Sequence, residues 1–186
     1  MRIGIAGAKG SFSEEAAENY TNKAGIKDYE FDYLVTVEAV LNNLTESKVD
    51  LGIFPIENSN GGIVIEAVHA MAKYSFAIKK LFDIDVHHNL LVQHGTTASD
   101  VKKVTSHDQA IKQCRMYLKR KWPDVDVREH EDTAKAAKEL GEGKLSSDTA
   151  VIAPKICAKL YDLDILEENI QDLKFNFTTF VVAKRI

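Results

Sequence analysis

The stretch "DLGIFPIENSNGGIVIEAVHAMAK", residues 50–73, places a strand, a polar turn and a helix in immediate succession. The apolar residues over 50–54 predict a strand, and Pro55 closes it because proline supplies no ladder donor and holds Phe54 in an extended conformation. Apolar positions over 62–73 recur with the period of a helix. A strand followed closely by a helix is the repeating unit of α/β proteins, so this stretch predicts that class of fold.

The same alternation extends in both directions from this stretch. Before it, we expect strands near 2–6 and 29–34 and helices near 12–22 and 36–46. After it, we expect strands near 77–82, 87–93, 103–105, 125–129, 149–153 and 178–183, and helices near 107–121, 132–141 and 154–161. Alternating strands and helices indicate βαβ units around a mostly parallel sheet. The number of elements also predicts a second α/β lobe.

The order of the elements suggests how the chain is divided. We assign residues 1–75 to a first lobe, 76–148 to a second lobe, and 149–186 to a return into the first lobe. If the last strand rejoins the first sheet, the chain crosses between the lobes twice. The cleft between the two lobes then becomes the expected ligand site.

Composition excludes several classes of partner. The chain has 186 residues and a formal net charge of -4, and its 24 Lys and Arg are scattered instead of forming the basic stripe that binds nucleic acid. No apolar run approaches the roughly 18 to 20 residues needed to cross a bilayer. The N-terminus enters a strand without a signal sequence, so we expect a cytoplasmic protein. Cys114 and Cys157 are expected to be small buried hydrophobes.

A glycine loop, Gly7-Ala8-Lys9-Gly10, joins the first expected strand to the first helix. Such loops let backbone N–H groups approach an anion at a helix N-terminus. The dinucleotide fingerprint would also need glycine where Ile5 stands, so a nucleotide site is disfavoured. Ser11 and Glu14 fit a capping box, which explains the serine but leaves Lys9 unexplained.

A polar cluster, Glu57, Asn58 and Ser59, follows the strand over 50–54. One interpretation is that Asn58 and Ser59 cap the helix near 62 while Glu57 is simply exposed. Ligands gather at the carboxyl ends of parallel strands in open α/β sheets, and both this cluster and the glycine loop occupy such ends. The cluster is therefore also a candidate binding site.

The segment "SHDQAIKQC", residues 106–114, follows another strand. Ser106 and Gln109 form a second capping box, and His107 is expected to be exposed near the helix N-terminus. The histidines show no spacing typical of metal ligands, so no metal site is predicted. Thr133 follows Asp132 at another expected cap, and helix N-termini of this kind attract carboxylates.

The segment "NFTTFVV", residues 176–182, begins the last strand. Thr178 and Thr179 lie there between Phe177 and Phe180. Because β-branched residues are common in strands, the pattern alone leaves these residues structural.

Taken together, five segments resemble the catalytic domain of prephenate dehydratase, in the order found in that family. They are "GAKGSFSEEAA" (7–17), "GIFPIENSNGGIV" (52–64), "SHDQAIKQC" (106–114), "DTAKAA" (132–137) and "TAVIAPKICAKLYDLDILEENIQDLKFNFTTF" (149–180). The resemblance covers nearly the whole chain. It implies two α/β lobes around a cleft, similar to type II periplasmic solute-binding proteins, and a homodimer or larger assembly.

The resemblance also implies a reaction. Prephenate would lose carbon dioxide and hydroxide to give phenylpyruvate, a step toward phenylalanine, which makes the protein a carbon–oxygen lyase with a small-molecule substrate and with no metal or organic cofactor. Thr178 matches the threonine of the family's Thr-Arg-Phe motif, which is thought to donate to the leaving hydroxyl. The residues that we assign to substrate binding are Lys9, Ser11, Glu57, Asn58, Ser59, Ser106, His107, Gln109, Thr133, Asn176, Thr179 and Phe180.

Two departures from the family pattern matter. Thr179 stands where the family has arginine, and threonine cannot replace the bidentate guanidinium, so the identity of the substrate is open. We hypothesise that the ammonium of Lys9 restores the missing positive charge.

The chain stops at Ile186, where most relatives continue into an ACT-type domain that senses phenylalanine. We therefore expect no feedback inhibition through such a domain. Three alternatives stay open: a prephenate decarboxylase, an arogenate dehydratase, and a non-catalytic sensor of small carboxylates.

Overall fold

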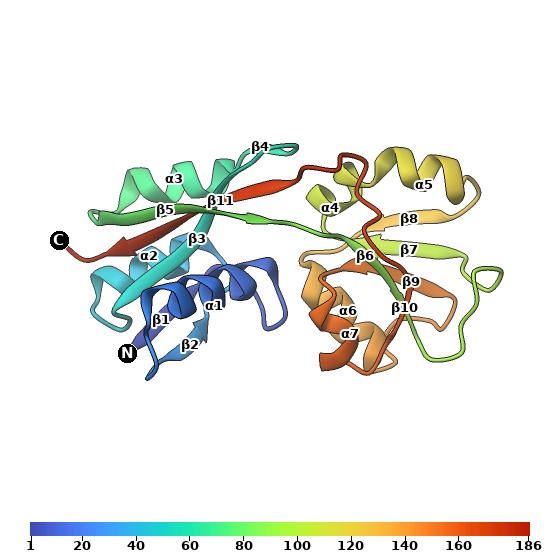
Figure 1. Cartoon of the computed structure of the whole chain (residues 1–186), viewed down its shortest axis with the longest axis horizontal. Helices are drawn as coiled ribbons and strands as arrows, with labels where there is room; N and C mark the ends of the chain where they lie inside the picture. Colours follow the sequence, from blue (N-terminus) through green and yellow to red (C-terminus); the bar gives the residue numbers. More distant parts are fainter. The chain divides into compact units, whose positions relative to one another are not determined.

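The computed structural model describes residues 1–186 and divides the chain into two compact units. The first unit comprises Met1–Asp85 and Phe177–Ile186, and the second comprises Val86–Asn176. The chain therefore leaves the first unit once and returns to it for its last strand (Figure 1).

The first unit is a sheet with helices on both faces. Its elements are β1 (Arg2–Ile5), α1 (Phe12–Ala24), β2 (Glu30–Tyr33), α2 (Val37–Thr45), β3 (Leu51–Asn58), β4 (Gly62–Ile63), α3 (Ile65–Lys73), β5 (Ala77–Asp85) and β11 (Phe177–Lys184). The strand order is β2-β1-β3-β11-β5, and β4 pairs with the end of β3. β1 is parallel to β2 and β3, whereas β11 is antiparallel to both β3 and β5.

Consecutive residues of β11 show which helix covers which face of this sheet. The ring of Phe180 contacts Phe82, which in turn contacts Tyr20 of α1. Val181 belongs instead to the core formed with α2 and α3. Because consecutive strand residues point to opposite faces, α1 covers one face and α2 and α3 cover the other. A Cβ on Gly52 would lie 2.6 Å from Val40 Cγ1, so α2 packs this closely on β3 only because residue 52 is glycine.

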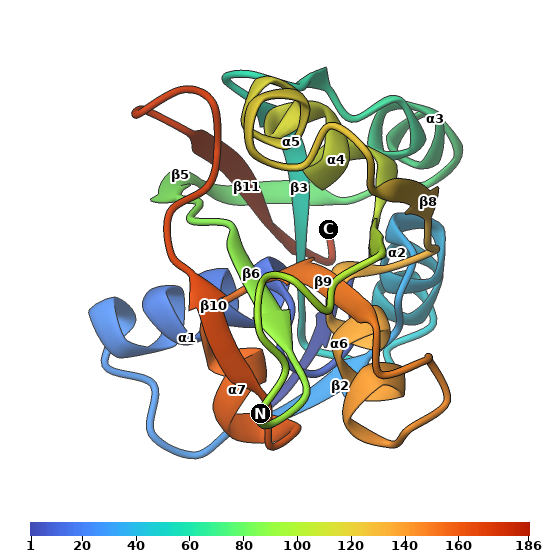
Figure 2. The same cartoon turned by 90° about the vertical axis from the view of Figure 1, so that its right-hand side faces the viewer.

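The second unit has its own sheet and core. Its elements are β6 (Asn89–Val92), β7 (Lys103–Ser106), α4 (Asp108–Gln113), α5 (Arg115–Lys121), β8 (Asp126–Glu129), α6 (Thr133–Gly141), β9 (Thr149–Ala153), α7 (Ile156–Leu160) and β10 (Asp164–Glu167). The strand order is β10-β6-β9-β7-β8, with β7 parallel to β8 and β9. Figure 2 shows α4 and α5 on one side of this sheet and α6 and α7 on the other.

The α/β class, the two units and the return of the last strand to the first sheet confirm the sequence-based expectations. Cys114 and Cys157 are buried and free, as expected. No helix of the protein combines the length and apolar character that crossing a membrane would require.

The boundaries between the units differ from those expected at 75/76 and 148/149. The chain leaves the first unit after Asp85 because β5 pairs with β11 along its whole length, from Ala77 to Asp85. It returns only at Phe177, since β9 pairs with β6 and β7 and thus belongs to the sheet of the second unit. Strand pairing between distant segments sets both boundaries, and a local pattern does not reveal such pairing.

The expected end of β3 at Pro55 was wrong. β3 continues to Asn58, and the β11 ladder shifts register between Thr179 and Phe180, where Phe180 faces Pro55. A bulge at this point allows proline to lie inside a strand, because the missing N–H is not needed there. The expected caps were also wrong, since α3 begins after Val64 without a side-chain cap from Asn58 or Ser59.

The helix expected over 107–121 is two helices. The backbone of Cys114 leaves helical geometry and separates α4 from α5. The carboxylate of Asp172 accepts hydrogen bonds from the backbone N–H groups of Met116 and Tyr117, at 2.7 Å each. These bonds satisfy the N–H groups that a new helix start leaves without partners.

A buried polar network holds the two chain crossings together within the second unit. The backbone N–H of Val86 donates to the carbonyl of Asn176 at 2.7 Å, and Asn176 Nδ2 donates to the carbonyl of Val86 at 3.1 Å. Asn176 Nδ2 also donates to Gln113 Oε1 at 2.7 Å, and His88 Nε2 lies 2.8 Å from the same oxygen. An amide oxygen can only accept, so His88 Nε2 carries a proton.

Burial lowers the pKa of His88 to about 4. The hydrogen bond to Gln113 acts in the opposite direction and raises this pKa, but its effect is smaller than that of burial. In the unfolded chain the imidazole takes a proton near its ordinary pKa of 6.5. The unfolded state therefore binds more protons between these two values, and the protein loses stability as the pH falls through this window. The loss from this group amounts to at most about 3 kcal/mol.

We predict that the free energy of unfolding falls between pH 7 and pH 4, and that His88→Gln flattens this dependence. Urea unfolding at several pH values, followed through the fluorescence of Trp122 in the second unit, measures the slope. His69→Gln, which alters an exposed histidine of α3, should keep the wild-type slope. Equal slopes for the wild type and His88→Gln would contradict the assignment.

Candidate functional site

In the first unit, the structure joins two of the candidate residues across the β3–β11 ladder. Asn58 ends β3 and lies directly opposite Thr178 of β11. Asn58 Nδ2 lies 2.8 Å from Thr178 Oγ1. Both side chains are buried, with exposed fractions of 8% for Asn58 and 9% for Thr178. The hydroxyl of Thr178 is therefore held in one place by a side chain from a segment 120 residues away.

Backbone contacts fix the orientation of the Asn58 amide. Its other end accepts hydrogen bonds from the N–H groups of Asn60, at 2.9 Å, and Gly61, at 2.7 Å. Backbone N–H groups only donate, so the atom that faces them is Oδ1 and the atom that faces Thr178 is Nδ2. The turn after β3 thus determines the direction of the Asn58–Thr178 hydrogen bond.

This direction determines what the Thr178 hydroxyl can do. Nδ2 can only donate, so Thr178 Oγ1 accepts and its own hydrogen must point elsewhere. The hydroxyl is thereby prepared to donate a hydrogen bond to another group. Donors held in advance toward a developing negative charge are among the most effective devices in catalysis.

Ser59 and Glu57 have different surroundings from Asn58. Ser59 is tied to Phe177 twice, because its N–H donates to the Phe177 carbonyl at 2.8 Å and its Oγ accepts from the Phe177 N–H at 2.9 Å. Ser59 therefore extends the pairing of β3 with β11. Glu57 is exposed and lies opposite Thr179 in the ladder.

Thr179 points to the face of the sheet opposite to that of Thr178, since the two residues are consecutive in the β11–β5 ladder. Its Oγ1 donates to Asp83 Oδ1 at 2.7 Å. The structure therefore does not bring Thr179 together with Thr178 and Asn58. Thr179 lies between two carboxylates, Glu57 on β3 and Asp83 on β5.

The glycine loop forms the N-terminus of α1. Ser11 Oγ accepts from the N–H of Glu14 at 3.4 Å, which confirms the expected N-cap. The second contact of the expected capping box differs, because the N–H of Ser11 donates to the carbonyl of Ala8. The carboxylate of Glu14 accepts from the N–H of Gly10 and from the hydroxyl of Tyr33. The Glu14 carboxylate thus already accepts from one of the backbone N–H groups that would bind a phosphate. Lys9 is exposed in this loop.

A close approach explains the first glycine of this loop. A Cβ on Gly7 would lie 2.3 Å from Ser11 Oγ. The glycine is therefore required for the tight turn into α1, without reference to a nucleotide.

In the second unit, the N-cap of α4 is not Ser106, as the sequence predicted. His107 is the N-cap, and its Nδ1 accepts from the N–H of Gln109 at 3.3 Å. Ser106 is fully buried, and its Oγ donates to the carbonyl of Ile152 at 2.6 Å. Ser106 therefore joins β7 to β9 and is not open to a ligand, whereas Gln109 is exposed.

Thr133 begins α6, beyond the end of β8. The carbonyl of Ser106 accepts from the N–H of His130 at 2.7 Å, which holds the ends of β7 and β8 together. The chain then enters α6 with Asp132 as its N-cap, whose carboxylate accepts from the N–H of Lys135 at 2.7 Å. The loops that carry His107 and Thr133 therefore follow the adjacent carboxyl ends of the parallel strands β7 and β8.

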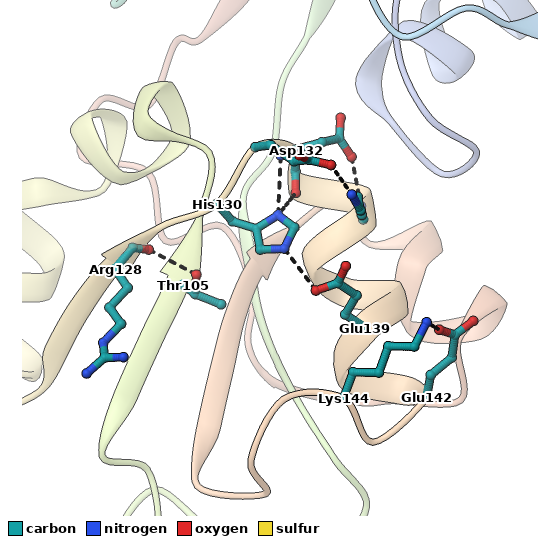
Figure 3. Close-up of polar contacts among 9 residues, drawn as sticks. Thr105, Arg128, His130, Asp132, Glu139, Glu142 and Lys144 are labelled. Atoms are coloured by element: carbon teal, nitrogen blue, oxygen red, sulfur yellow. Dashed lines mark hydrogen bonds and ion pairs between the residues drawn. The ribbon is translucent and has the colours of Figure 1, made fainter.

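A histidine that the sequence analysis did not select stabilises the start of α6. Figure 3 shows the His130 imidazole between the Asp132 carbonyl, 3.1 Å from Nδ1, and Glu139 Oε2, 3.1 Å from Nε2. The side chain thus joins the loop before α6 to the last turn of the same helix. No local motif marks this contact, because Glu139 lies nine residues away.

Two further assignments to substrate binding disagree with the structure. Phe180 is 1% exposed and packs against Phe82 in the core of the first unit. Asn176 is fully buried, and its amide is held by Val86 and Gln113. Both side chains stabilise the fold around Thr178 and are not available to a substrate. No group of three or more His, Cys, Asp or Glu side chains is arranged to hold a metal ion.

Comparison with known proteins identifies the family. The family model described as prephenate dehydratase matches residues 3–185. The chain is 37% identical over 182 residues to the prephenate dehydratase of Methanocaldococcus jannaschii, covering 96% of this chain and 63% of that protein. It is 36% identical over 187 residues to the chloroplastic arogenate dehydratase/prephenate dehydratase 2 of Arabidopsis thaliana, covering 100% of this chain and 46% of that protein.

Solved structures agree with this result. The prephenate dehydratase of Arthrobacter aurescens, solved in complex with L-Phe, superposes with a TM-score of 0.90 at 25% identity and covers 100% of this chain and 61% of that one. A periplasmic substrate-binding protein of an ABC transporter from Coxiella burnetii gives a TM-score of 0.51 at 17% identity, over 97% of this chain and 84% of that one. The latter likeness concerns the fold alone and confirms the predicted similarity to periplasmic binding proteins.

The chain spans 63% of the M. jannaschii relative and 46% of the A. thaliana relative. The match to the family model nevertheless covers nearly all of its 186 residues. The chain therefore belongs to the prephenate dehydratase family.

Proposed function

We propose that this protein converts prephenate to phenylpyruvate by loss of carbon dioxide and hydroxide. The observation that carries the proposal is the Asn58–Thr178 pair, in which a buried hydroxyl is oriented as a donor. The match to the family over residues 3–185 supports the same activity. The reaction would make the protein a carbon–oxygen lyase.

The chemistry needs few groups from the protein. The bond between the ring and its carboxylate breaks, and its electron pair moves into the ring as carbon dioxide leaves. The bond between the ring and its hydroxyl then breaks, so that hydroxide departs and the ring becomes aromatic. Negative charge develops on this departing oxygen, and a hydrogen bond from the Thr178 hydroxyl would stabilise it. Aromatisation supplies the driving force, so a strong base is not required.

The substrate also carries two carboxylates that need partners. Lys9 offers an exposed ammonium near the N-terminus of α1, and Ser11, Glu57 and Ser59 lie on the same unit. His107, Gln109 and Thr133 are the second unit's exposed or partly exposed candidates. Helix N-termini and ammonium groups both favour a carboxylate, which supports Lys9 and Thr133 as binding partners.

A second candidate substrate is arogenate, which carries an amino group in place of the keto group of prephenate. One relative at 36% identity is named for both arogenate and prephenate dehydratase activity. Thr179 replaces the family's arginine beside Glu57 and Asp83, so this chain has two carboxylates and no cation at that place. A less positive surface is more compatible with a substrate that carries an ammonium group. A cytoplasmic location and a homo-oligomeric state also form part of the proposal.

We predict that Thr178→Val lowers kcat for phenylpyruvate formation by about 100-fold or more, because the leaving oxygen loses its donor. The measurement is the rate of phenylpyruvate formation from prephenate at neutral pH, with arogenate tested in parallel. The matched control is Thr21→Val, which removes a buried hydroxyl that donates to the Glu18 carbonyl within α1. Binding of prephenate without turnover by the wild type would indicate a sensor, and release of carbon dioxide without phenylpyruvate would indicate a decarboxylase.

We predict that Asn58→Asp lowers kcat by about 10- to 100-fold with a smaller change in KM. The new carboxylate keeps the contacts with the N–H groups of Asn60 and Gly61, but it accepts where the amide donated. The hydrogen of Thr178 then turns toward residue 58 and away from the leaving oxygen. Asn22→Asp, which introduces the same charge at an exposed position of α1, is the control. An unchanged kcat in Asn58→Asp would contradict this role of the amide.

We predict that Lys9→Ala raises the KM for prephenate by about tenfold and that Lys9→Arg restores most of the affinity, since one charge-assisted contact contributes on the order of 1.4 kcal/mol. The effect should weaken at high salt because Lys9 is exposed. Lys23→Ala, at the other end of α1, serves as the control. A KM that does not change in Lys9→Ala would refute the idea that this ammonium replaces the family's arginine.

A further inference from the structure

Both ring nitrogens of His130 face an oxygen atom that accepts hydrogen bonds. Nδ1 lies 3.1 Å from the carbonyl oxygen of Asp132, and Nε2 lies 3.1 Å from Glu139 Oε2 (Figure 3). A carbonyl and an ionised carboxylate only accept, whereas a neutral imidazole has one N–H and the imidazolium has two. The charged ring of His130 therefore donates to both oxygens at once, and the neutral ring cannot.

The neutral ring has a different partner within reach. The backbone nitrogen of Asp132 lies 3.4 Å from His130 Nδ1, and its N–H donates there only when Nδ1 carries no proton. A neutral ring that keeps its proton on Nε2 for Glu139 therefore accepts from the N–H of Asp132 and no longer donates to its carbonyl. The gain or loss of one proton thus moves the contact of His130 between the two backbone groups of Asp132.

Asp132 determines the position of the first turn of α6. Its carbonyl also accepts from the N–H of Ala136 at 3.1 Å, and its carboxylate caps the helix through the N–H of Lys135. Thr133 follows it directly and is the first residue of α6. A change in the backbone contact of Asp132 is therefore passed on to Thr133, which we assign to substrate binding.

The charged groups closest to His130 in the sequence belong to its own loop and to α6. Glu131 forms an ion pair with Lys135, and the carboxylate of Asp132 is used as the N-cap. Glu139 is thus the carboxylate that opposes the imidazolium. The side chains of His130 and Glu139 are only 15% and 25% exposed, so salt and water screen this contact less than an ion pair on the open surface.

Neighbouring elements add charged groups with other partners. β9, on which α6 packs, has no charged residue, and Glu129 and Lys159 are exposed to solvent. Other charged groups form pairs of their own, which are Arg128 with Asp126, Lys103 with Asp148, and Lys112 with Asp108. His107 follows the adjacent strand β7 and is a second histidine near the start of α6, so an experiment on pH has to separate the two histidines.

We propose that His130 is a positioning residue for the substrate. Its imidazolium holds the start of α6 in the form in which Thr133 binds a carboxylate of the substrate, and loss of its proton weakens that binding. The positive charge itself acts in the same direction, because it lies close to the anion. The affinity for a dianion therefore falls as the pH rises and His130 is deprotonated. This inference rests on the proposed function, since Thr133 is a binding residue only for that substrate.

The experiment compares the pH dependence of kcat and KM for prephenate in the wild type and three variants, from about pH 5.5 to about pH 8.5, where histidines change charge. His130→Gln removes the titrating ring, and Glu139→Gln keeps an acceptor oxygen but removes its charge. The control is His94→Gln, which changes a histidine that contacts Asp162 and Asp164 elsewhere in the second unit. All four proteins contain His107, so its titration is common to them.

We predict that the KM of the wild type rises by about threefold to tenfold across this range and that His130→Gln has the higher KM throughout, with the kcat of the wild type at each pH. In Glu139→Gln the rise should begin at lower pH, because the imidazolium has lost its carboxylate. His94→Gln should follow the wild type. A KM that rises with pH in His130→Gln as it does in the wild type would overturn the proposal.

A second measurement needs no substrate. Nuclear magnetic resonance follows the ring nitrogens of His130 and the backbone amides of Asp132 and Thr133 over the same pH range. The amide proton of Asp132 should move downfield as the ring loses its proton, because it gains Nδ1 as an acceptor, and it should stay constant in His130→Gln. Amides that do not titrate with the ring would overturn the positioning role. If they titrate together but the wild type forms no phenylpyruvate, the proposed function fails, and the link to the substrate fails with it, while the coupling of His130 to α6 stands.

Discussion

The pairing of β11 with both β3 and β5 is the interaction on which the first unit depends. β11 inserts between the two strands in an antiparallel orientation and completes the sheet with residues that follow the entire second unit. Without this pairing, β5 would have no neighbouring strand, and the side chain of Asn58 would not contact that of Thr178. The same strand supplies Phe180 to the core and, two residues earlier, Thr178 to the candidate site. Fold and site therefore rest on one set of backbone hydrogen bonds.

The turn after β3 determines which side chain donates and which accepts in the Asn58–Thr178 hydrogen bond. An asparagine amide has a donor end and an acceptor end, and its orientation decides whether a neighbouring hydroxyl accepts or donates. Here the backbone N–H groups of Asn60 and Gly61 fix the orientation of the Asn58 amide without a substrate. The orientation requires no charged residue, which is compatible with the dianionic substrate that we propose. Thr179 takes no part in this arrangement, because it faces Asp83 on the other side of the sheet.

Features with a local cause were predicted from the sequence, and features with a distant cause were not. The α/β class, the cap at Ser11 and the burial of both cysteines follow from periodicity, capping chemistry and residue type. The unit boundaries depend on which distant strands pair, and neither a proline nor a glycine marks that choice. Ser106 and Asn176 belong to motifs shared with the family, yet their polar atoms bond to Ile152, Val86 and Gln113 inside the fold. A motif identifies residues that matter but does not separate those that contact a substrate from those that support the contact.

The discontinuity of the first unit has a consequence for how the protein is made. A ribosome synthesises the chain from the N-terminus, so the second unit, Val86–Asn176, is complete while β11 is still missing. The second unit contains all of its own strands and is able to fold at that stage, as domains generally do during synthesis. The first unit then waits with the edges of β3 and β5 unpaired, and unpaired edges are the surfaces through which nascent chains aggregate. Assembly of the first unit is thus a late event in translation, and a chaperone that shields strand edges would act on this protein before β11 emerges and not after.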